Sequence, residues 1–477
     1  MSEFMELLVS ALSPARRAVL VLLCLAQLMV ILDISAVNVA LPDLSRDLGI
    51  ARGDLEWTIT SYSLLFGSLL LLGGRAADVL GRRRTFLAGL ALFTVASMAA
   101  ALAPTDAALY AARASQGVGA ALLSPAALSI ITTTFASGRE RAMALGAWGA
   151  VGGAGAAIGV LLGGVLTEWI GWRAIFFVNV PVGVALAIGV LRAVRPDPEP
   201  ARLSGLDLRG ALVATASLAA LLYAIAGADS AGWTSARTLA LGGAALAGLA
   251  AFAALERRAA RPLLRVELLA DRAVGGGWVL MLLASAVLMG SFLLTSVYLQ
   301  EVLDASALET GLAFLPIAVA TAAGAHGGSH LVRQVGVRAP MAVAFALAAT
   351  GMLLLSGAGG GGSYLTDVLP GMLVAGVGLG IAMVCVAVAV LTGASEEDAG
   401  MLSGLNSTGH EVGGALGLAA LTTIASAANP LATGVGDAFL AAAAIAAAGV
   451  VLALVLLPSA GLFQRRMQQS PHPVSIH

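Results

Sequence analysis

Charge is scarce in this sequence of 477 residues, because only 11% of them are Asp, Glu, Lys or Arg. A soluble globular domain carries about 25% charged residues. A chain so poor in charge cannot cover a surface that faces water, so lipid must cover most of it. The hydrophobic content of 59% and the mean hydropathy of +0.94 point the same way. The composition therefore indicates an integral membrane protein.

Lysine is absent, so all 26 basic residues are arginine. The formal net charge of -1 and the isoelectric point near 6.5 give no sign of a nucleic-acid partner. The two cysteines, Cys24 and Cys385, lie far apart in apolar runs. They predict neither a disulfide framework nor a metal site. We expect no cofactor and no metal ion.

The alternating pattern of a membrane β-barrel strand is also missing from the long Ala, Leu, Gly and Val runs. A helix crosses a hydrocarbon core of about 30 Å with roughly 20 apolar residues. We therefore predict an all-α polytopic membrane protein with 14 transmembrane helices. The apolar windows are 18–40, 55–74, 85–103, 107–130, 142–167, 173–191, 208–227, 237–255, 274–299, 308–326, 338–356, 367–392, 401–424 and 436–458.

Arginine placement predicts the orientation of the chain in the membrane. Arginine is enriched in the cytoplasmic segments of membrane proteins. With the N-terminus in the cytoplasm, only Arg46, Arg52, Arg173 and Arg237 fall in outer loops, and Arg113 lies within a span. The other 21 arginines fall in inner segments. We predict that both termini are cytoplasmic.

Glycine positions predict an internal repeat. A shift of 254 residues relates Gly117 to Gly371, and a shift of 255 relates Gly81 to Gly336. We therefore predict two six-helix bundles, residues 1–191 and 273–477, joined by residues 192–272 with spans seven and eight. Such parallel repeats are typical of transporters that bind substrate between their halves. The shift of 254 also relates three glycines of the fifth span to three of the thirteenth: Gly155, Gly159 and Gly163 to Gly409, Gly413 and Gly417.

Asp33 and Arg113 are ionisable residues inside predicted spans. Such a group costs at least ~2.5–3.5 kcal/mol at the membrane centre. Asp33 lies about 15 residues into the first span and Arg113 about 6 residues from the outer end of the fourth, so at 1.5 Å per residue they can share a depth. We predict that they pair and that Asp33 gains and loses a proton during transport. The alternative is a static pair that only fixes helix packing.

His410 and Glu411 lie near the middle of the thirteenth span. Glu411 is on the helix side opposite the stripe of Gly409, Gly413 and Gly417, so it points to another surface. An imidazole titrates near neutral pH and can take part in proton transfer. A hydrogen-bonded structural pair is the alternative interpretation.

The loop after the second span combines two glycines, an acid and arginines. These groups can form an ion-pair latch that holds the two halves together on the inner side. Anchoring of the span by positive charge is the alternative, but it accounts only for the arginines. The residues are Gly74, Asp78, Gly81, Arg82 and Arg83.

These features together resemble the major facilitator superfamily, and in particular its 14-span drug:proton antiporters, over almost the whole chain. Residues 32–42 resemble the first-span motif and residues 74–84 the inner-loop motif. Residues 113–120 resemble the fourth-span motif, whose arginine is linked to proton transfer in the family. Residues 171–181 and 298–300 also fit the family pattern.

The fifth span resembles the antiporter motif through Gly155, Gly159, Gly163 and Gly164. Val160 stands where that motif has proline, which removes a kink and weakens the inference of antiport from this motif.

The resemblance implies a secondary active transporter of the bacterial inner membrane. It implies proton-coupled export of small lipophilic or cationic compounds, such as drugs or antibiotics, by alternating access, with protons as the coupling ion. We expect a monomer in the lipid bilayer with a small-molecule substrate. Candidates for the cavity lining are Asp33, Asn38, Tyr62, Gln116, Tyr298, Gln300 and Asn406.

Three other functions stay open at this stage. An exporter of one endogenous metabolite, lipid or siderophore would have the same sequence features. A membrane enzyme is disfavoured, because no span carries a Ser/His or Asp/Asp pair at catalytic spacing or an HExxH motif. A channel is disfavoured by the repeat and by the buried titratable groups. We therefore expect no enzymatic activity.

Overall fold

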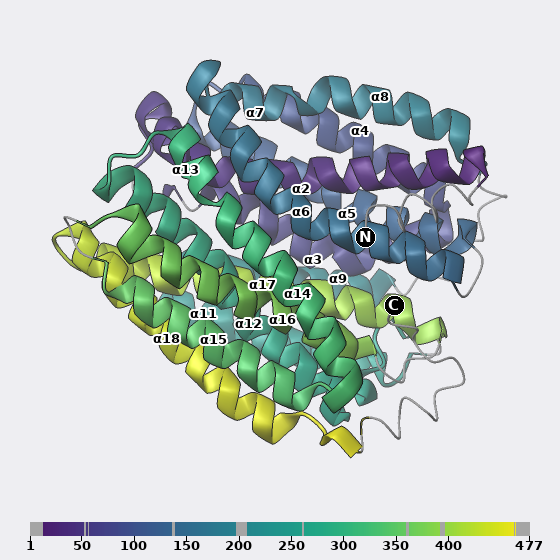
Figure 1. The fold of residues 1–477 in the computed structure, drawn as a ribbon. Coiled ribbons are helices and arrows are strands. Elements are labelled where there is room, and N and C mark those ends of the chain that lie inside the picture. Colours follow the sequence, from purple (N-terminus) through teal and green to yellow (C-terminus); the bar gives the residue numbers. More distant parts are fainter. Residues whose placement is uncertain are drawn as a thin grey trace.

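The computed structural model describes residues 13–51, 54–55, 57–135, 139–196, 208–259, 262–358, 362–391, 396–461 and 463. Every regular element within these residues is a helix (Figure 1), as the all-α prediction requires. The N-terminal helices, which we call the first group, are α2 (Pro14–Leu48), α3 (Trp57–Leu80), α4 (Arg82–Ala101), α5 (Asp106–Thr134), α6 (Arg139–Trp169), α7 (Arg173–Phe177) and α8 (Asn179–Ala193).

Two further sets of helices follow along the chain. The middle helices, which we call the inserted hairpin, are α9 (Leu208–Ala226), α10 (Ala228–Ala231) and α11 (Ala236–Glu256). After η3 (Val266–Ala270), the second group consists of α12 (Arg272–Val297), η4 (Tyr298–Val302), α13 (Ala307–Ala313), α14 (Leu315–Val335), α15 (Arg338–Ser356), η5 (Tyr364–Val368), α16 (Leu369–Leu391), α17 (Glu396–Ser426) and α18 (Leu431–Leu456).

Eleven helices of the described residues are long and apolar enough to cross a membrane. They confirm a polytopic membrane protein. The other three expected spans coincide with α3, α6 and α17, each of which includes side chains outside the described part of the chain. The total of 14 spans therefore stays a prediction.

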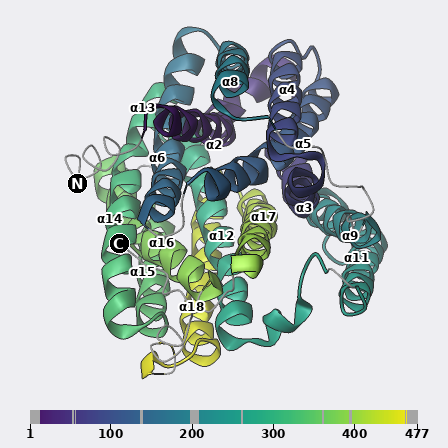
Figure 2. The same ribbon diagram turned by 90° about the vertical axis from the view of Figure 1, so that its right-hand side faces the viewer.

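The helices of each group pack mainly against one another. In Figure 1 the two groups lie closest on the left, where α13 lies, and diverge toward the right. They touch where α6 meets α13 and where α3 meets α17. The inserted hairpin lies to one side, where α9 packs on both α3 and α17 (Figure 2). The residue bounds predicted for the two bundles stay a prediction.

Equivalent glycines follow the second long helix of each group. Gly81 has φ 100° between α3 and α4, and Gly336 has φ 74° between α14 and α15. Glycine adopts positive φ at no steric cost, whereas other residues do so rarely. The shift of 255 residues therefore relates two chain reversals with the same backbone requirement.

The glycine stripes also recur as equivalent helix contacts. A side chain at Gly159 would overlap Ser35 and press on Leu32, so α6 lies directly against α2. A side chain at Gly413 would overlap the backbone of Leu282, so α17 lies directly against α12. Small residues allow this approach of helix backbones in membranes.

One glycine correspondence does not extend to packing. Gly117 on α5 faces the backbone of Tyr62 in α3, whereas Gly371 on α16 faces Gly351 in α15. Helix α15 lies one position later in the second group than α3 does in the first. The two glycines related by this shift of 254 residues therefore have different packing roles.

Filling the α12–α17 contact should destabilise the protein. We expect Gly413→Val to lower the free energy of unfolding by at least about 1–3 kcal/mol, because the new side chain meets backbone that cannot move aside. Thermal unfolding in detergent measures the effect. Gly242→Val on α11 is the matched control, because Gly242 has open space around it. Equal stability of the two variants would contradict the close approach of α17 to α12.

Candidate functional site

The expected pair of buried charges is present in the first group. The Arg113 guanidinium forms a salt bridge with the Asp33 carboxylate. Each residue is only 1% exposed. Asp33 comes from α2 and Arg113 from α5, so residues 80 positions apart share one depth, as their spacing along the two helices predicts. The opposite charges compensate each other where neither is hydrated.

Neutral side chains complete the coordination of both charges. Gln116 donates to Asp33 Oδ1 at 3.0 Å and Asn179 donates to the same oxygen at 2.8 Å. Ser97 Oγ accepts a hydrogen bond from Gln116 at 2.7 Å. Arg113 donates through Nε to the Thr58 carbonyl at 3.0 Å and through a terminal nitrogen to Gln116 Oε1 at 3.0 Å. The donors thus satisfy the hydrogen-bonding capacity of this buried carboxylate.

Two aromatic rings enclose the guanidinium. Its central carbon lies 4.5 Å from the Tyr62 ring centroid and 5.7 Å from that of Phe176. A cation within about 6 Å of an aromatic face is attracted by the ring quadrupole. The Tyr62 hydroxyl is buried and has no hydrogen-bond partner within the described structure. Arg113 is thus held by an ion pair on one side and by aromatic faces on the other.

The network lies inside the first group. Its side chains come from α2, α3, α4 and α5, from α7, and from the start of α8. Three residues expected to line a substrate cavity, Asp33, Tyr62 and Gln116, are between 0% and 1% exposed. In this conformation they are enclosed by helices rather than facing a space between the two groups.

The sequence interpretation did not assign Asn179 or Ser97 to the site. Asn179 lies within residues 171–181, which fit the family pattern, so that resemblance contained a signal for it. Ser97 lies in an apolar helix and has no such signal. Its role depends on α4 packing against α5.

The other cavity candidates are dispersed. The Asn38 side-chain amide donates to the Ile34 carbonyl of its own helix. The backbone carbonyl of Asn38 accepts a hydrogen bond from the Ser296 hydroxyl of the second group at 3.2 Å. Tyr298 belongs to the hydrophobic core of the second group. Asn406 on α17 has a buried side-chain oxygen without a hydrogen-bond partner in the described structure. The structure therefore does not bring the seven candidates together.

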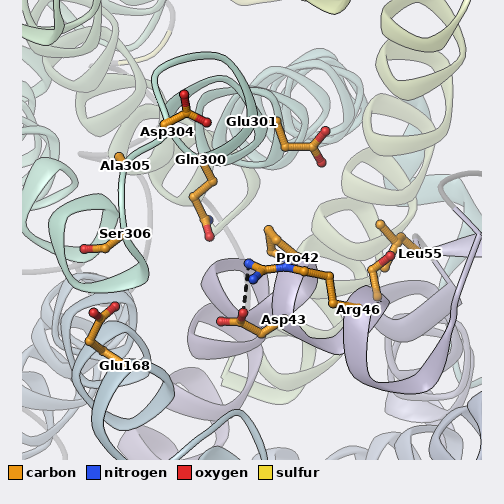
Figure 3. A pocket seen from close by; sticks show the side chains of 11 residues that line it. Pro42, Asp43, Arg46, Leu55, Glu168, Gln300, Glu301, Asp304, Ala305 and Ser306 are labelled. Atoms are coloured by element: carbon orange, nitrogen blue, oxygen red, sulfur yellow. Dashed lines mark ion pairs between the residues drawn. The ribbon is translucent and has the colours of Figure 1, made fainter.

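A pocket of about 690 Å³ lies between the two groups at the end where α2 and α6 finish (Figure 3). Acidic side chains from both groups surround it, and its arginine, Arg46, pairs with Asp43 at 2.9 Å. Gln300 is the one cavity candidate among its lining residues. The lining residues are Pro42, Asp43, Ser45, Arg46, Leu55, Glu168, Gln300, Glu301, Asp304, Ala305 and Ser306.

His410 and Glu411 face different neighbours. His410 Nδ1 is hydrogen-bonded to Ser285 of α12, within the second group. The Glu411 side chain packs against Gly67 of α3, in the first group, and its carboxylate interacts with Ser63 one turn earlier on that helix. Glu411 thus points away from the glycine stripe, as its helix position predicts, and contacts the opposite group. The two residues do not form the structural pair that was the alternative interpretation.

The inner loop is described only in part. Gly81 precedes α4, and Arg83 donates to the Leu191 carbonyl of α8 at 2.7 Å. This contact lies within the first group. The side chain of Asp78 lies outside the described residues. The ion-pair latch formed with Gly74 and Arg82 therefore stays a prediction.

Three of the four antiporter-motif glycines, Gly155, Gly159 and Gly163, lie on the face of α6 that contacts α2. Gly155 faces Leu28 and Ile31, and Gly163 would overlap Ala36 if it carried a side chain. Gly164 is buried. Helix α6 continues without interruption through Val160, where the family motif has proline.

Comparison with known proteins identifies the family of this chain. A family model described as Major Facilitator Superfamily matches residues 23–418, which is most of the chain. The chain belongs to this superfamily. Membership in the major facilitator superfamily identifies it as a multi-pass membrane transporter rather than an enzyme.

Relatives of this major facilitator protein include named resistance and export proteins. Puromycin resistance protein pur8 of Streptomyces alboniger is 41% identical over 422 residues, which cover 87% of this chain and 83% of the relative. Cephamycin export protein CmcT of Amycolatopsis lactamdurans is 39% identical over 445 residues, which cover 92% of each chain. The lincomycin resistance protein of Streptomyces lincolnensis is 35% identical, and the match covers 96% of this chain and 95% of the relative.

A solved structure supports the fold at low identity. The bacterial homologue of the human lysosomal transporter Spinster, in its inward-facing and unoccupied conformation, matches with a TM-score of 0.64 at 16% identity. The match covers 96% of this major facilitator chain and 98% of the other. At this identity the likeness concerns the fold alone.

Proposed function

We propose that this protein is a proton-coupled exporter of antibiotics or similar lipophilic or cationic compounds in the bacterial inner membrane. The full-length similarity to proteins named for puromycin resistance, cephamycin export and lincomycin resistance supports the substrate class. The buried Asp33–Arg113 pair is the observation that supports proton coupling. Both termini lie in the cytoplasm under this proposal, and the exporter works as a monomer.

The geometry links proton binding to a change of conformation. In this arrangement Arg113, Gln116 and Asn179 all donate to the Asp33 carboxylate. A proton from the outer side neutralises the carboxylate and leaves Arg113 as a buried cation without its partner. Loss of a buried partner costs about 3–5 kcal/mol. A shift of this size is enough to move a two-state equilibrium by more than a hundredfold.

The free-energy cost of leaving Arg113 without its partner drives alternating access. The predicted bundles of residues 1–191 and 273–477 move relative to each other when Asp33 takes a proton. Substrate leaves to the outer side during that change, and proton release to the cytoplasm resets the pair. The conformation with the Asp33–Arg113 pair intact is the one ready to receive substrate from the cytoplasm.

Everted membrane vesicles test this function. We expect puromycin, lincomycin or a lipophilic cation to cause proton efflux from energised vesicles that contain the wild-type protein, read with a pH-sensitive dye. Asp33→Asn should abolish the response, because the amide cannot exchange a proton. Asp47→Asn is the matched control on the same helix, since Asp47 pairs with Arg173 at an exposed position worth about 0–1 kcal/mol. Retention of the response in Asp33→Asn would overturn the assignment.

A further inference from the structure

The two groups meet closely at Glu411. A side chain at Gly67 of α3 would overlap the Glu411 side chain of α17. We call this contact, lined by Ser63, Gly67 and Glu411, the α3–α17 seam. Ser63 lies one helical turn before Gly67 on the same face of α3, and its hydroxyl interacts with the Glu411 carboxylate across the seam. An ionisable group of the second group is therefore held directly by the first group.

The inserted hairpin covers the seam. Leu218 and Leu222 of α9 pack against Val412 and Ala415 of α17, and Leu222 also reaches Gly67. Figure 2 shows α9 beside both α3 and α17. The hairpin thus places an apolar layer over the side of the seam that it faces.

The hairpin also contacts both groups near its turn. Tyr223 of α9 lies against Trp57 at the start of α3, with ring centroids 5.7 Å apart. Trp233 donates to the Thr423 hydroxyl of α17 at 3.3 Å. The covering layer is therefore attached on both sides of the seam.

Helix α3 connects the seam to the charged network. Ser63 faces Glu411, and the preceding residue, Tyr62, lies over Arg113 at 4.5 Å. Successive residues of an α-helix point about 100° apart, so one turn can contact both surroundings. The Tyr62 hydroxyl interacts electrostatically with Asp33, Arg113 and Glu411. A displacement of α3 at Ser63 therefore also displaces the ring that encloses Arg113.

We propose that Ser63 is a positioning residue that couples a second proton site, Glu411, to the Asp33–Arg113 pair through α3. This inference rests on the proposed function. Ser63 donates a charge-assisted hydrogen bond while Glu411 is ionised, and such bonds are roughly twice as strong as neutral ones. A proton on the Glu411 carboxylate removes the charge and weakens the hold of α3 on α17. Tyr62 then moves with α3 and changes the surroundings of Arg113.

The groups that face Glu411 are few. From α3 they are Ser63 and Tyr62, and Tyr62 also interacts with Asp33 and Arg113. The α9 contacts are leucines. His410 is adjacent on α17 but bonds to Ser285 on the other side.

A double-mutant cycle tests the coupling. We expect Ser63→Ala to lower the export rate roughly tenfold, because the hydrogen bond to a charged acceptor is lost. It should also change the pH profile of export. In a Glu411→Gln background the same substitution should change neither the rate nor the profile, because the charged acceptor is gone. Ser63→Thr, which keeps the hydroxyl, should restore wild-type behaviour.

Controls separate this coupling from simple packing. Ser61→Ala removes an equally small buried hydroxyl on α3 that has no partner in the described structure, and it should leave the pH profile unchanged. Additive effects of Ser63→Ala and Glu411→Gln, with substrate-driven proton release intact in the wild type, would overturn the coupling alone. Absence of proton release in the wild type would overturn the proposed function and the coupling with it.

Discussion

Replacing Arg113 with leucine abolishes export and sharply reduces the amount of folded transporter. The substitution leaves the Asp33 carboxylate buried without a cation, while Gln116 and Asn179 remain as neutral hydrogen-bond donors to it. Removing one member of a buried pair costs about 3–5 kcal/mol. The full free-energy cost applies here because Asp33 is 1% exposed and water cannot replace the guanidinium. Thermal unfolding in detergent and export from cells measure the two effects.

A second variant distinguishes loss of folding from loss of coupling. Asp33→Asn combined with Arg113→Gln removes both charges and keeps polar groups of similar size at both positions. We expect this double variant to recover most of the folded yield and none of the substrate-driven proton release. Recovery of proton release would show that neither charge carries the proton. Failure of Arg113→Leu to destabilise the protein would show that the pair has no structural value.

Enlarging Gly311 to leucine stops export without unfolding the protein. Gly311 in α13 lies against the backbone of Val160 and Leu161 in α6, where the two groups touch. Overpacking of a close contact costs about 1–3 kcal/mol, which changes the ratio of two conformations by roughly ten- to a hundredfold. Because each group keeps its own internal contacts, we expect a change of only a few degrees in melting temperature and at least a tenfold loss of export.

The matched control for this variant is Gly243→Leu on α11, where open space surrounds the glycine. It should export at the wild-type rate. Labelling of single cysteines placed in the pocket between the groups reports which side is open. Normal export by Gly311→Leu would mean that α13 and α6 need not approach each other closely during the transport cycle.

Much of the membrane architecture could be predicted from local sequence. Helices in a membrane require about 20 apolar residues each, and every expected window overlaps an observed helix. The ends are less accurate, since α2 and α14 extend to Leu48 and Val335, beyond the predicted ends at 40 and 326. The common depth of Asp33 and Arg113 follows from a constant rise of 1.5 Å per residue. Equivalent turns at Gly81 and Gly336 follow from the positive φ that glycine tolerates.

The composition of the site was less predictable. Asn179 and Ser97 join the network only because α8 and α4 pack beside α2 and α5, which no periodicity within one helix specifies. The seven cavity candidates were chosen by polarity and depth. Neither property tells whether a side chain faces its own group or the space between groups, and the structure disperses them.

The sequence by itself determined the membrane class, the helix positions, the repeat of close glycine contacts and the depth of the charged residues. These properties depend on composition and on the fixed rise of a helix. Only the tertiary structure decided that Asp33 is enclosed within the first group, that His410 and Glu411 face different neighbours, and that α9 covers the α3–α17 seam. These properties depend on which helices become neighbours, and that choice is made by packing between segments far apart in the chain.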